Sequence, residues 1–415
     1  MADGAPALCG RRLRLGHMKI QKKDPWLLPE GITEVLPDDA ARLEGLRRTL
    51  LDTFATWGYQ LVIPPFVDFL DSLLTGSGHD LDLQTFKLTD QLSGKLLGVR
   101  SDMTPQVARI DAHNLHHDWP TRLCYVGTTL QTLGDALEKN RSPMQIGAEL
   151  YGHAGIESDY EIICLMLEML AISGLQNVHL DLGHVGIYRA LADMAGLDDQ
   201  QEAELFEVLQ RKARPELFAM IDGWAIDTRF KTLFNALPTL NGGADVIERA
   251  ASLLTIGNPV LDRALADLRD LASRLSIDFP SLAISFDLAE LRGYHYHTGI
   301  VFAAFVPTVG REIARGGRYD NIGGVFGRAR PATGFSADLK VLASLLAQDE
   351  CEVVQTVFAP AVNDRALTQT VRDLRVDGLK VIQQLPGQMG GAVELGCNAV
   401  LQWDGQRWVV NPHSP

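Results

Sequence analysis

The sequence has few cysteines, no long apolar run and a shortage of basic residues. Its five cysteines stand at scattered positions without CxxC spacing: Cys9, Cys124, Cys164, Cys351 and Cys397. This spacing argues against a disulfide framework or a structural zinc site and fits a reducing cytoplasm. The longest apolar helix candidate, Ile162 to Ile172, contains Glu168, so it falls short of the roughly 18 apolar residues of a spanning helix. We therefore expect a cytoplasmic protein with no membrane segment.

Basic residues are outnumbered, since 38 Lys and Arg face 52 Asp and Glu for a net charge of −14. A polyanion must meet a basic surface, so this balance disfavours a general nucleic-acid binder. Six bases fall within residues 1–23, which lack the apolar core of a secretory signal. We interpret residues 1–23 as a disordered basic leader, with Met18 as an alternative start. The other reading is a presequence or a nucleic-acid arm.

The length of 415 residues, 46% of them hydrophobic, predicts two or three domains with sizeable cores. Strand and helix patterns alternate over residues 24–195 and 276–347, which we interpret as one α+β core. Residues 196–275 are rich in Ala and Leu and predict a helical insertion, because Leu261, Leu265 and Leu268 share one helical face. Residues 348–415 predict a small C-terminal α/β domain.

Within the first part of the core, apolar spacing predicts a helix that begins at Pro37 and ends before Gly58. A short strand, Tyr59 to Ile63, follows and is stopped by two prolines. Further strands are predicted at Leu96–Arg100, Arg122–Gln131 and Met144–Gly152, and helices at Thr104–Leu115 and Glu157–Ser173. The last two strands flank a polar loop and predict a hairpin.

The second part of the core and the C-terminal domain show shorter patterns. Strands are predicted at Leu282–Phe286, Gly299–Phe305, Val353–Phe358, Lys380–Gln383 and Ala399–Trp403, with a helix at Asp364–Val376. Strands and a helix alternating over about 65 residues are typical of a small α/β module.

Familiar catalytic and metal-binding motifs are absent from the sequence. His113 and His117 lie four apart, but no HExxH motif surrounds them. His295 and His297 would project to the same side of a strand, with no nearby carboxylate cluster. The glycine-rich segment 316–320 lacks dinucleotide spacing and is either a plain loop or a ligand-facing loop. No GxSxG elbow is present. We expect neither a metal nor a cofactor.

Four segments, taken in order, resemble the core of class II aminoacyl-tRNA synthetases, and most closely that of histidyl-tRNA synthetase. They are Tyr59–Pro65, Arg122–Gly152, Leu291–Gly299 and Gly316–Asp320 with Thr333–Phe335. The first resembles the dimer-forming motif 1, the second the paired strands of motif 2, the third the histidine-reading segment and the fourth motif 3. The resemblance covers residues 24–345 and implies an antiparallel sheet flanked by helices.

Two departures from the synthetase pattern affect adenylation. The resemblance implies an arginine that clamps the ATP α-phosphate where this sequence has Gln131, and an arginine that stacks on adenine where it has Val341. A neighbouring Lys340 would fill the second position after a one-residue shift, but lysine has no planar guanidinium. Losing one preorganised donor typically costs on the order of a hundredfold in rate. Adenylation should be absent or vestigial.

The amino-acid pocket implied by the resemblance is partly retained. Its residues are Asp102, Thr104, Gln145, Glu149, Arg292, Tyr296 and His297. Asp102 and Thr104 would hold an α-ammonium, whereas His297 replaces a tyrosine. Two carboxylates, an amide and a guanidinium suit a zwitterion with a polar ring. The alternative is that these are leftover polar residues of the core.

The C-terminal 66 residues hold five bases against seven acids, which does not suit an RNA-gripping domain. A synthetase fold with these losses resembles the regulatory subunits of ATP phosphoribosyltransferase, which are paralogues of histidyl-tRNA synthetase. That resemblance implies a non-catalytic chain that forms a homodimer within a hetero-oligomer with the short-form catalytic subunit. Such a chain is needed for the first step of histidine biosynthesis and for feedback inhibition by L-histidine, and it has no tRNA partner. The alternatives are a divergent histidyl-tRNA synthetase, an amino-acid ligase and a scaffold without ligand.

Overall fold

The computed structural model describes residues 26–74, 79–134, 140–254, 256–291, 293, 296–346 and 355–413. The leader predicted over residues 1–23 lies outside them. The chain divides into two compact units, Met1–Leu345 and Leu346–Pro415. No helix in the described part of the chain is long and apolar enough to cross a membrane.

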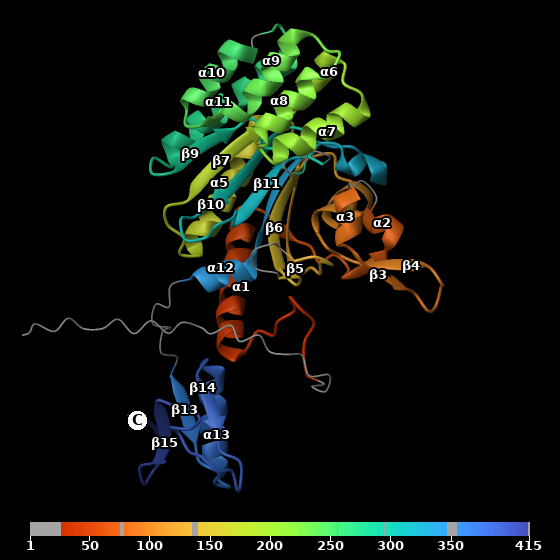
Figure 1. Ribbon diagram of the computed structural model, residues 1–415. Helices are drawn as coiled ribbons and strands as arrows, with labels where there is room; N and C mark the ends of the chain where they lie inside the picture. The colour runs from red at the N-terminus through yellow and green to blue at the C-terminus, as the bar shows by residue number, and fades with distance from the viewer. Residues whose placement is uncertain are drawn as a thin grey trace, which may run out of the picture. The chain divides into compact units, whose positions relative to one another are not determined.

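A nine-stranded sheet forms the centre of the first unit (Figure 1). In spatial order its strands are β1 (Gln60–Leu61), β5 (Thr121–Thr128), β6 (Met144–Tyr151), β12 (Ala332–Asp338), β11 (Ala314–Arg318), β10 (Ile300–Phe305), β7 (His179–His184), β9 (Ala283–Asp287) and β8 (Asn241–Gly242). Neighbours are antiparallel except for β1 with β5 and β7 with β9. The α+β class predicted from the sequence is confirmed, and β5 and β6 form the predicted hairpin.

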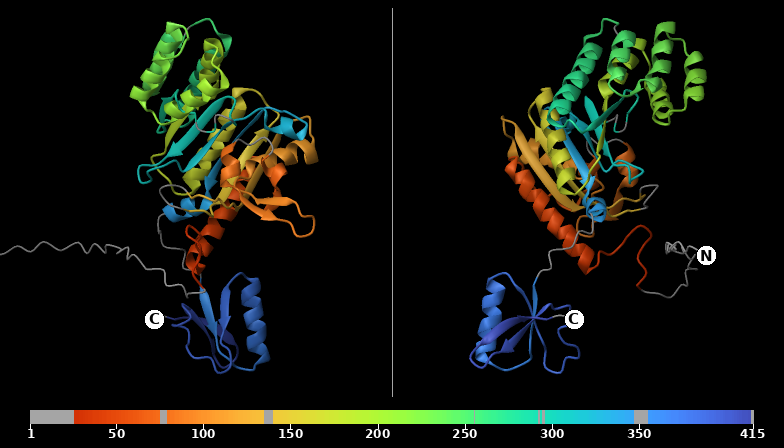
Figure 2. Two further views of the ribbon diagram at one scale, coloured as in Figure 1. Left: turned by 45° about the vertical axis from the view of Figure 1, so that its right-hand side comes forward. Right: turned by 90° about the vertical axis from the view of Figure 1, so that its left-hand side faces the viewer.

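Two long helices, α1 (Pro37–Thr56) and α5 (Ile156–Ile172), pack against each other and against the strands of this sheet (Figure 2). The apolar spacing that predicted α1 places Leu50 and Phe54 fully inside. Phe54 meets Phe335 of β12 edge to face, with ring centroids 6.1 Å apart. The amphipathic stripe of α1 thus covers one side of the strands that carry the site.

Most of the remaining helices of this unit lie together beyond one end of the sheet (Figure 1). They are α6 (Val185–Ala195), α7 (Asp199–Gln210), α8 (Arg214–Asp222), α9 (Thr228–Ala236), the 3₁₀ helix η2 (Leu237–Thr239), α10 (Asp245–Leu254) and α11 (Pro259–Asp278). The leucines that predicted one helical face, including Leu261, Leu268 and Leu275, are buried on α11. The same stretch also supplies β8, a short strand that the sequence pattern did not predict.

The first unit also contains a smaller sheet of three strands. It comprises β2 (Val67–Phe69), β4 (Leu96–Val99) and β3 (Phe86–Thr89), with α2 (Leu70–Leu74) and α3 (His79–Gln84), and leads into α4 (Thr104–Arg109) and the π-helix η1 (Ile110–Leu115). The helix predicted as one element therefore changes type after Arg109. The strand predicted to reach Gln131 ends at Thr128, and Gln131 forms only an isolated bridge with Thr85. The strand predicted from Tyr59 to Ile63 is likewise only two residues long.

The elements that complete the chain are the 3₁₀ helix η3 (Ile322–Phe326), α12 (Leu339–Leu345), β13 (Thr356–Ala359), α13 (Arg365–Val376), β14 (Lys380–Gln383), β15 (Ala399–Trp403) and β16 (Trp408–Pro412). In the second unit β13 pairs in parallel with β14 and β15, whereas β16 is antiparallel. Asp364 caps α13 by accepting from the Ala366 amide at 2.8 Å and also accepts from the Trp408 indole at 2.7 Å. This is the small α/β module that the sequence predicted.

Candidate functional site

A cavity of about 820 Å³ lies within the first unit. Its wall includes six residues that the sequence predicted as ligand contacts: Asp102, Thr104, Gln145, Glu149, Tyr296 and His297. The seventh, Arg292, lies outside the described residues. Residues separated by nearly 200 positions in the chain are therefore brought to one site.

The register of the central sheet places the main acidic group of this site. Glu149 on β6 pairs with Gly334 on β12, which in turn pairs with Gly317 on β11. Because side chains alternate along a strand, Gln145 and Glu149 project from the same side of β6. The hairpin and the glycine-rich strand therefore meet at the cavity.

Asp102, in the wall of the cavity, is held in place by hydrogen bonds from Gln145 and Thr104. The Gln145 amide donates to Asp102 Oδ1 at 2.7 Å and accepts from the Met103 amide at 2.9 Å, and the Thr104 amide donates to the same Oδ1 at 3.2 Å. Both of these hydrogen bonds use Oδ1, so they leave Oδ2 able to accept from a ligand. A carboxylate fixed in this way suits an ammonium group.

Glu149 is almost completely buried, with 1% of its surface exposed. Its Oε1 accepts from the hydroxyls of Thr104 and Tyr125, each at 3.0 Å, and its Oε2 accepts from the hydroxyl of Tyr319. Burial raises the pKa of Glu149 to about 8, although the hydrogen bonds from Tyr319 and Tyr125 favour the ionised form. Glu149 is therefore poised to gain or lose a proton near neutral pH.

Gly334 makes room for this carboxyl group. A Cβ atom at position 334 would lie 1.6 Å from Glu149 Oε2 and 2.7 Å from the Ala148 carbonyl oxygen. Any side chain there would displace Glu149 from its hydroxyl partners. Gly334 is thus part of the site although it carries no functional group.

Aromatic rings form the wall beside Glu149. Tyr296 stacks on Tyr319 with ring centroids 4.9 Å apart, and His297 meets Tyr296 edge to face at 5.2 Å. The Tyr296 hydroxyl and His297 Nδ1 are buried and make no hydrogen bond to any residue that the structure describes. Buried polar atoms without partners are rare in native proteins, so this wall suits a polar ligand.

His297 differs in position from its sequence prediction. It lies in the loop before β10 and not on a strand, and His295 is outside the described residues. Its ring fits between Gly293 and Gly317, where added Cβ atoms would approach it to 2.6 and 2.8 Å. Burial lowers the pKa of His297 to about 4, so the imidazole is neutral at physiological pH.

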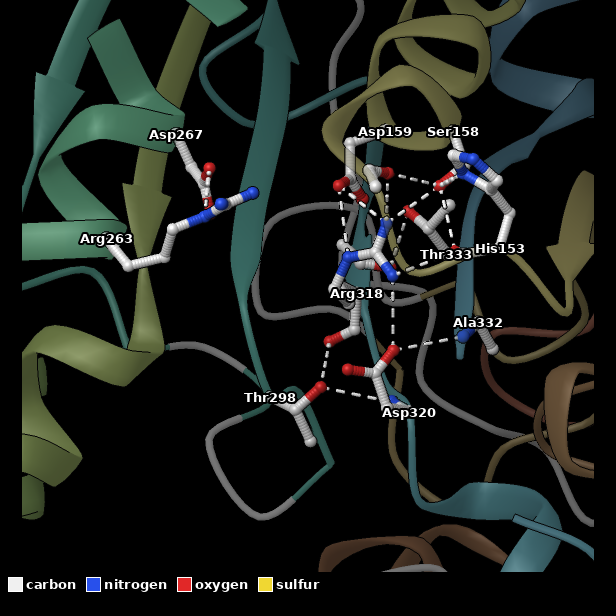
Figure 3. Close-up of polar contacts among 12 residues, drawn as sticks. His153, Ser158, Asp159, Arg263, Asp267, Thr298, Arg318, Asp320, Ala332 and Thr333 are labelled. Carbon is white, nitrogen blue, oxygen red and sulfur yellow. Dashed lines mark hydrogen bonds and ion pairs between the residues drawn. The ribbon is translucent and has the colours of Figure 1, made fainter. Parts of the chain in front are cut away.

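Arg318 anchors the strand that delivers Tyr319 (Figure 3). The buried guanidinium donates to Asp159 Oδ2 at 2.7 and 3.0 Å and to the Ser158 hydroxyl at 2.8 Å, both on α5. Thr298 accepts from the Asp320 amide at 3.0 Å and so links the loop of Tyr296 to the same strand end. Residues 316–318 of the segment predicted as a loop therefore belong to β11, because they pair with β12 and, at 316 and 317, also with β10.

Gln131 and Val341, at which the resemblance implies arginines in the synthetases, both lie among the described residues. Gln131 lines the cavity, and its amide donates to the Ser101 carbonyl at 3.5 Å. Val341 is buried in α12 and is not part of the cavity wall as described. The neighbouring Lys340 ammonium donates to the Ser142 carbonyl at 2.6 Å.

Sequence reasoning assigned no role to Tyr125, Tyr319 or Gly334, although all three fall within the segments that carried the resemblance. It also missed Arg311, which lines the cavity from the turn before β11. No local pattern marks Arg311, because its place depends on how β10 and β11 pair. Within the described part of the chain no group of three His, Cys, Asp or Glu could hold a metal ion.

Comparisons with known proteins give the family. Residues 31–342 match the family model of histidyl-tRNA synthetase, and residues 354–411 match that of the ATP phosphoribosyltransferase subunit HisZ C-terminal domain. An ATP phosphoribosyltransferase regulatory subunit from Methylococcus capsulatus is 59% identical over 391 residues, covering 94% of this chain and 96% of the relative. One from Alkalilimnicola ehrlichii is 53% identical over 393 residues, covering 94% and 98%.

Solved structures agree in fold. A crystal structure described as an ATP phosphoribosyltransferase regulatory subunit/histidyl-tRNA synthetase from Bacillus halodurans superposes with a TM-score of 0.80 at 28% identity, covering 91% of this chain and 98% of that one. Histidyl-tRNA synthetase from Nostoc sp. has a TM-score of 0.74 at 17% identity, covering 92% of both chains, which bears on the fold alone. The expected class II synthetase fold is thus confirmed, and the chain belongs to the family of ATP phosphoribosyltransferase regulatory subunits.

Proposed function

We propose that this chain is a non-catalytic subunit that binds L-histidine in its cavity and works with the short-form catalytic subunit of ATP phosphoribosyltransferase. One observation supports the proposal: in the cavity wall the hydroxyls of Thr104 and Tyr125 donate hydrogen bonds to Glu149, and the neutral Gln131 lines the same cavity. The resemblance implies that adenylation would need an arginine at position 131. The chain would then support the first step of histidine biosynthesis in the cytoplasm and transmit feedback inhibition.

L-Histidine fits the polarity of the cavity. Asp102, oriented by Gln145, would take the α-ammonium. The ring would lie against Glu149 and the wall of Tyr296 and His297, whose unpartnered atoms then find partners. By resemblance Arg292 would complete the set.

Gln131, Val341 and Lys340 argue against amino-acid activation. Adenylation develops negative charge on the α-phosphate, and the neutral amide of Gln131 cannot stabilise it as a guanidinium does. Val341 offers no adenine stacking from inside α12, and the ammonium of Lys340 is bound to a backbone carbonyl.

Regulation requires that L-histidine bind one conformation of the complex better than another. A coupling free energy of about 1–3 kcal/mol is sufficient for such an effect. We also propose a homodimer within the hetero-oligomer, because Tyr59–Pro65 resembles the dimer-forming motif 1. We propose no tRNA partner, because the C-terminal 66 residues carry more acids than bases.

Reconstitution tests the proposal directly. The chain is mixed with a short-form catalytic subunit, and phosphoribosyl-ATP formation is measured with and without L-histidine. We expect activity that depends on this chain and falls when L-histidine is added. Activity that is unchanged by the chain would refute the proposal.

The rival functions have separate readouts. Histidine-dependent exchange of pyrophosphate into ATP by the pure chain would identify a synthetase, and exchange with another amino acid would identify a ligase. A scaffold without ligand would give no heat with L-histidine, alone or in the complex. Glu149→Gln should weaken histidine binding, whereas Glu207→Gln, at an exposed position on α7, should not.

A further inference from the structure

Lys212 occupies an unusual backbone position in the turn between α7 and α8. Its φ of 52° lies in the left-handed region. Its amide donates to the Leu209 carbonyl at 2.9 Å, and the Ala213 amide donates to the Val208 carbonyl at 3.2 Å, which forms a Schellman motif. Four other helices, α1, α5, α6 and α13, end in the same motif with a left-handed glycine: Gly58, Gly174, Gly196 and Gly378. A left-handed lysine is strained relative to glycine, and such strain often marks a position where the side chain has a function.

The side chain of Lys212 forms an ion pair with Asp287 at the end of β9. The ammonium group, about half exposed, donates to Oδ2 of a carboxyl group that is almost completely buried. Oδ1 of the same carboxyl group accepts from the Ala289 amide at 3.0 Å and so shapes the turn after β9. Partial burial acts to lower the pKa of the ammonium group, but the hydrogen bond to Asp287 and the nearby carboxylates of Glu290 and Asp181 raise it. The ammonium group therefore stays charged and joins the helical insertion to the central sheet.

This ion pair lies close to the cavity without lining it. Phe206 and Gln210 of α7 are part of the cavity wall, and so is Glu290 in the turn after β9. Because Phe206 and Gln210 are four residues apart, they share one face of α7. Lys212 and Asp287 are not among the described residues of the wall. The ion pair is thus placed to fix the position of α7, and with it one side of the cavity.

We propose that Lys212 is a positioning residue for the binding of L-histidine: through its ion pair with Asp287 it holds α7 as the wall that the helical insertion contributes to the cavity. Without the ion pair, α7 would have to be ordered when the ligand binds, and such ordering lowers affinity. By linkage, a ligand in the cavity stabilises α7 in this position, so that binding changes the stability of the insertion. This inference rests on the proposed function, which supplies L-histidine as the ligand.

The test uses Lys212→Gly, because glycine suits the left-handed backbone and the change removes only the side chain. Binding of L-histidine is measured by calorimetry on the full chain and on its complex with the catalytic subunit. We expect Kd to rise at least about fivefold, which corresponds to ordering the two side chains of Phe206 and Gln210 on binding. Lys212→Arg keeps the charge and should restore most of the affinity. Arg269→Met, which breaks an exposed pair with Glu248 in the same insertion, should bind as wild type does.

A second measurement separates positioning from a general loss of stability. Hydrogen–deuterium exchange of α7 is compared with that of α11, another helix of the insertion, with and without L-histidine. In wild type the ligand should slow exchange in α7. In Lys212→Gly without ligand, exchange should be faster in α7 and unchanged in α11. In an Asp287→Asn background, Lys212→Gly should change Kd by less than about twofold, because the partner of the ammonium group is already lost.

The outcomes separate this inference from the proposed function. A wild-type Kd in Lys212→Gly, or a loss of affinity that Lys212→Arg does not restore, would overturn the positioning role while leaving histidine binding intact. Exchange in α7 that equals wild type, or that is faster throughout the insertion, would overturn it as well. Binding of L-histidine by neither the wild-type chain nor its complex would remove the proposed function, and this inference with it.

Discussion

Gly334→Ala is the most direct perturbation of the site, because it adds one carbon atom at the point where two strands and a carboxyl group meet. The new Cβ would lie 1.6 Å from Glu149 Oε2, whereas ordinary contacts begin at 3.4 Å. The carboxyl group must therefore move by roughly 2 Å, and the Ala148 carbonyl at 2.7 Å prevents the backbone from giving way freely.

The cost has two parts. Overpacking a buried site costs about 1–3 kcal/mol, and taking Glu149 away from its hydroxyl partners costs about 1–3 kcal/mol more. A unit the size of Met1–Leu345 loses roughly 1.4 °C of Tm for each kcal/mol. We expect Tm to fall by about 3–8 °C and L-histidine binding to be lost.

Differential scanning calorimetry and ligand titration measure both effects. Gly310→Ala is the matched control, since an added Cβ there meets no atom within 4 Å, and it should leave Tm and binding unchanged. If Gly334→Ala bound L-histidine normally and melted within about 1 °C of wild type, the assigned position of Glu149 would be incorrect.

Two further predictions concern buried charge. Folding raises the pKa of Glu149 from 4.5 to about 8, so the folded state holds a proton that the unfolded state loses, and stability falls as pH rises through this window. The Tm of Glu149→Gln relative to wild type should therefore climb between pH 5 and 8, by the equivalent of about 4 kcal/mol, and level off above pH 8; a flat difference would contradict the assignment. Asp159→Asn should cost about 3–5 kcal/mol in thermal unfolding, because it leaves the buried Arg318 guanidinium with only the more exposed Asp320 carboxylate, 3.3 Å away, as a counter-charge. Asp267→Asn, which breaks the pair with the exposed Arg263 (Figure 3), should cost less than about 1 kcal/mol, and equal losses in the two variants would contradict this difference.

Elements with strong local patterns were predictable from the sequence. The apolar spacing in α1 and the leucines of α11 determine which face is buried, and both helices form as expected. Elements that form only by pairing with distant parts of the chain were not predictable from the sequence. The strand β11 is rich in glycine and has no strand propensity of its own, yet it pairs with β10 and β12 and is held by Arg318.

The candidate site, too, was predictable from the sequence only in part. Resemblance picked out Asp102, Gln145 and Glu149 as ligand contacts, and all three line the cavity. It did not reveal that Glu149 is buried under three hydroxyls, or that Gly334 must lack a side chain for this to happen. These properties arise only when β6 and β12 lie in register.

The sequence by itself determined the residue types at the site, including Gln131, and the main amphipathic helices, because residue type and local spacing can be read from the chain. Only the tertiary structure decided the protonation of Glu149 and the neutrality of His297. Those properties depend on burial and on neighbours more than 100 residues away, such as Tyr319 for Glu149, which no local pattern contains.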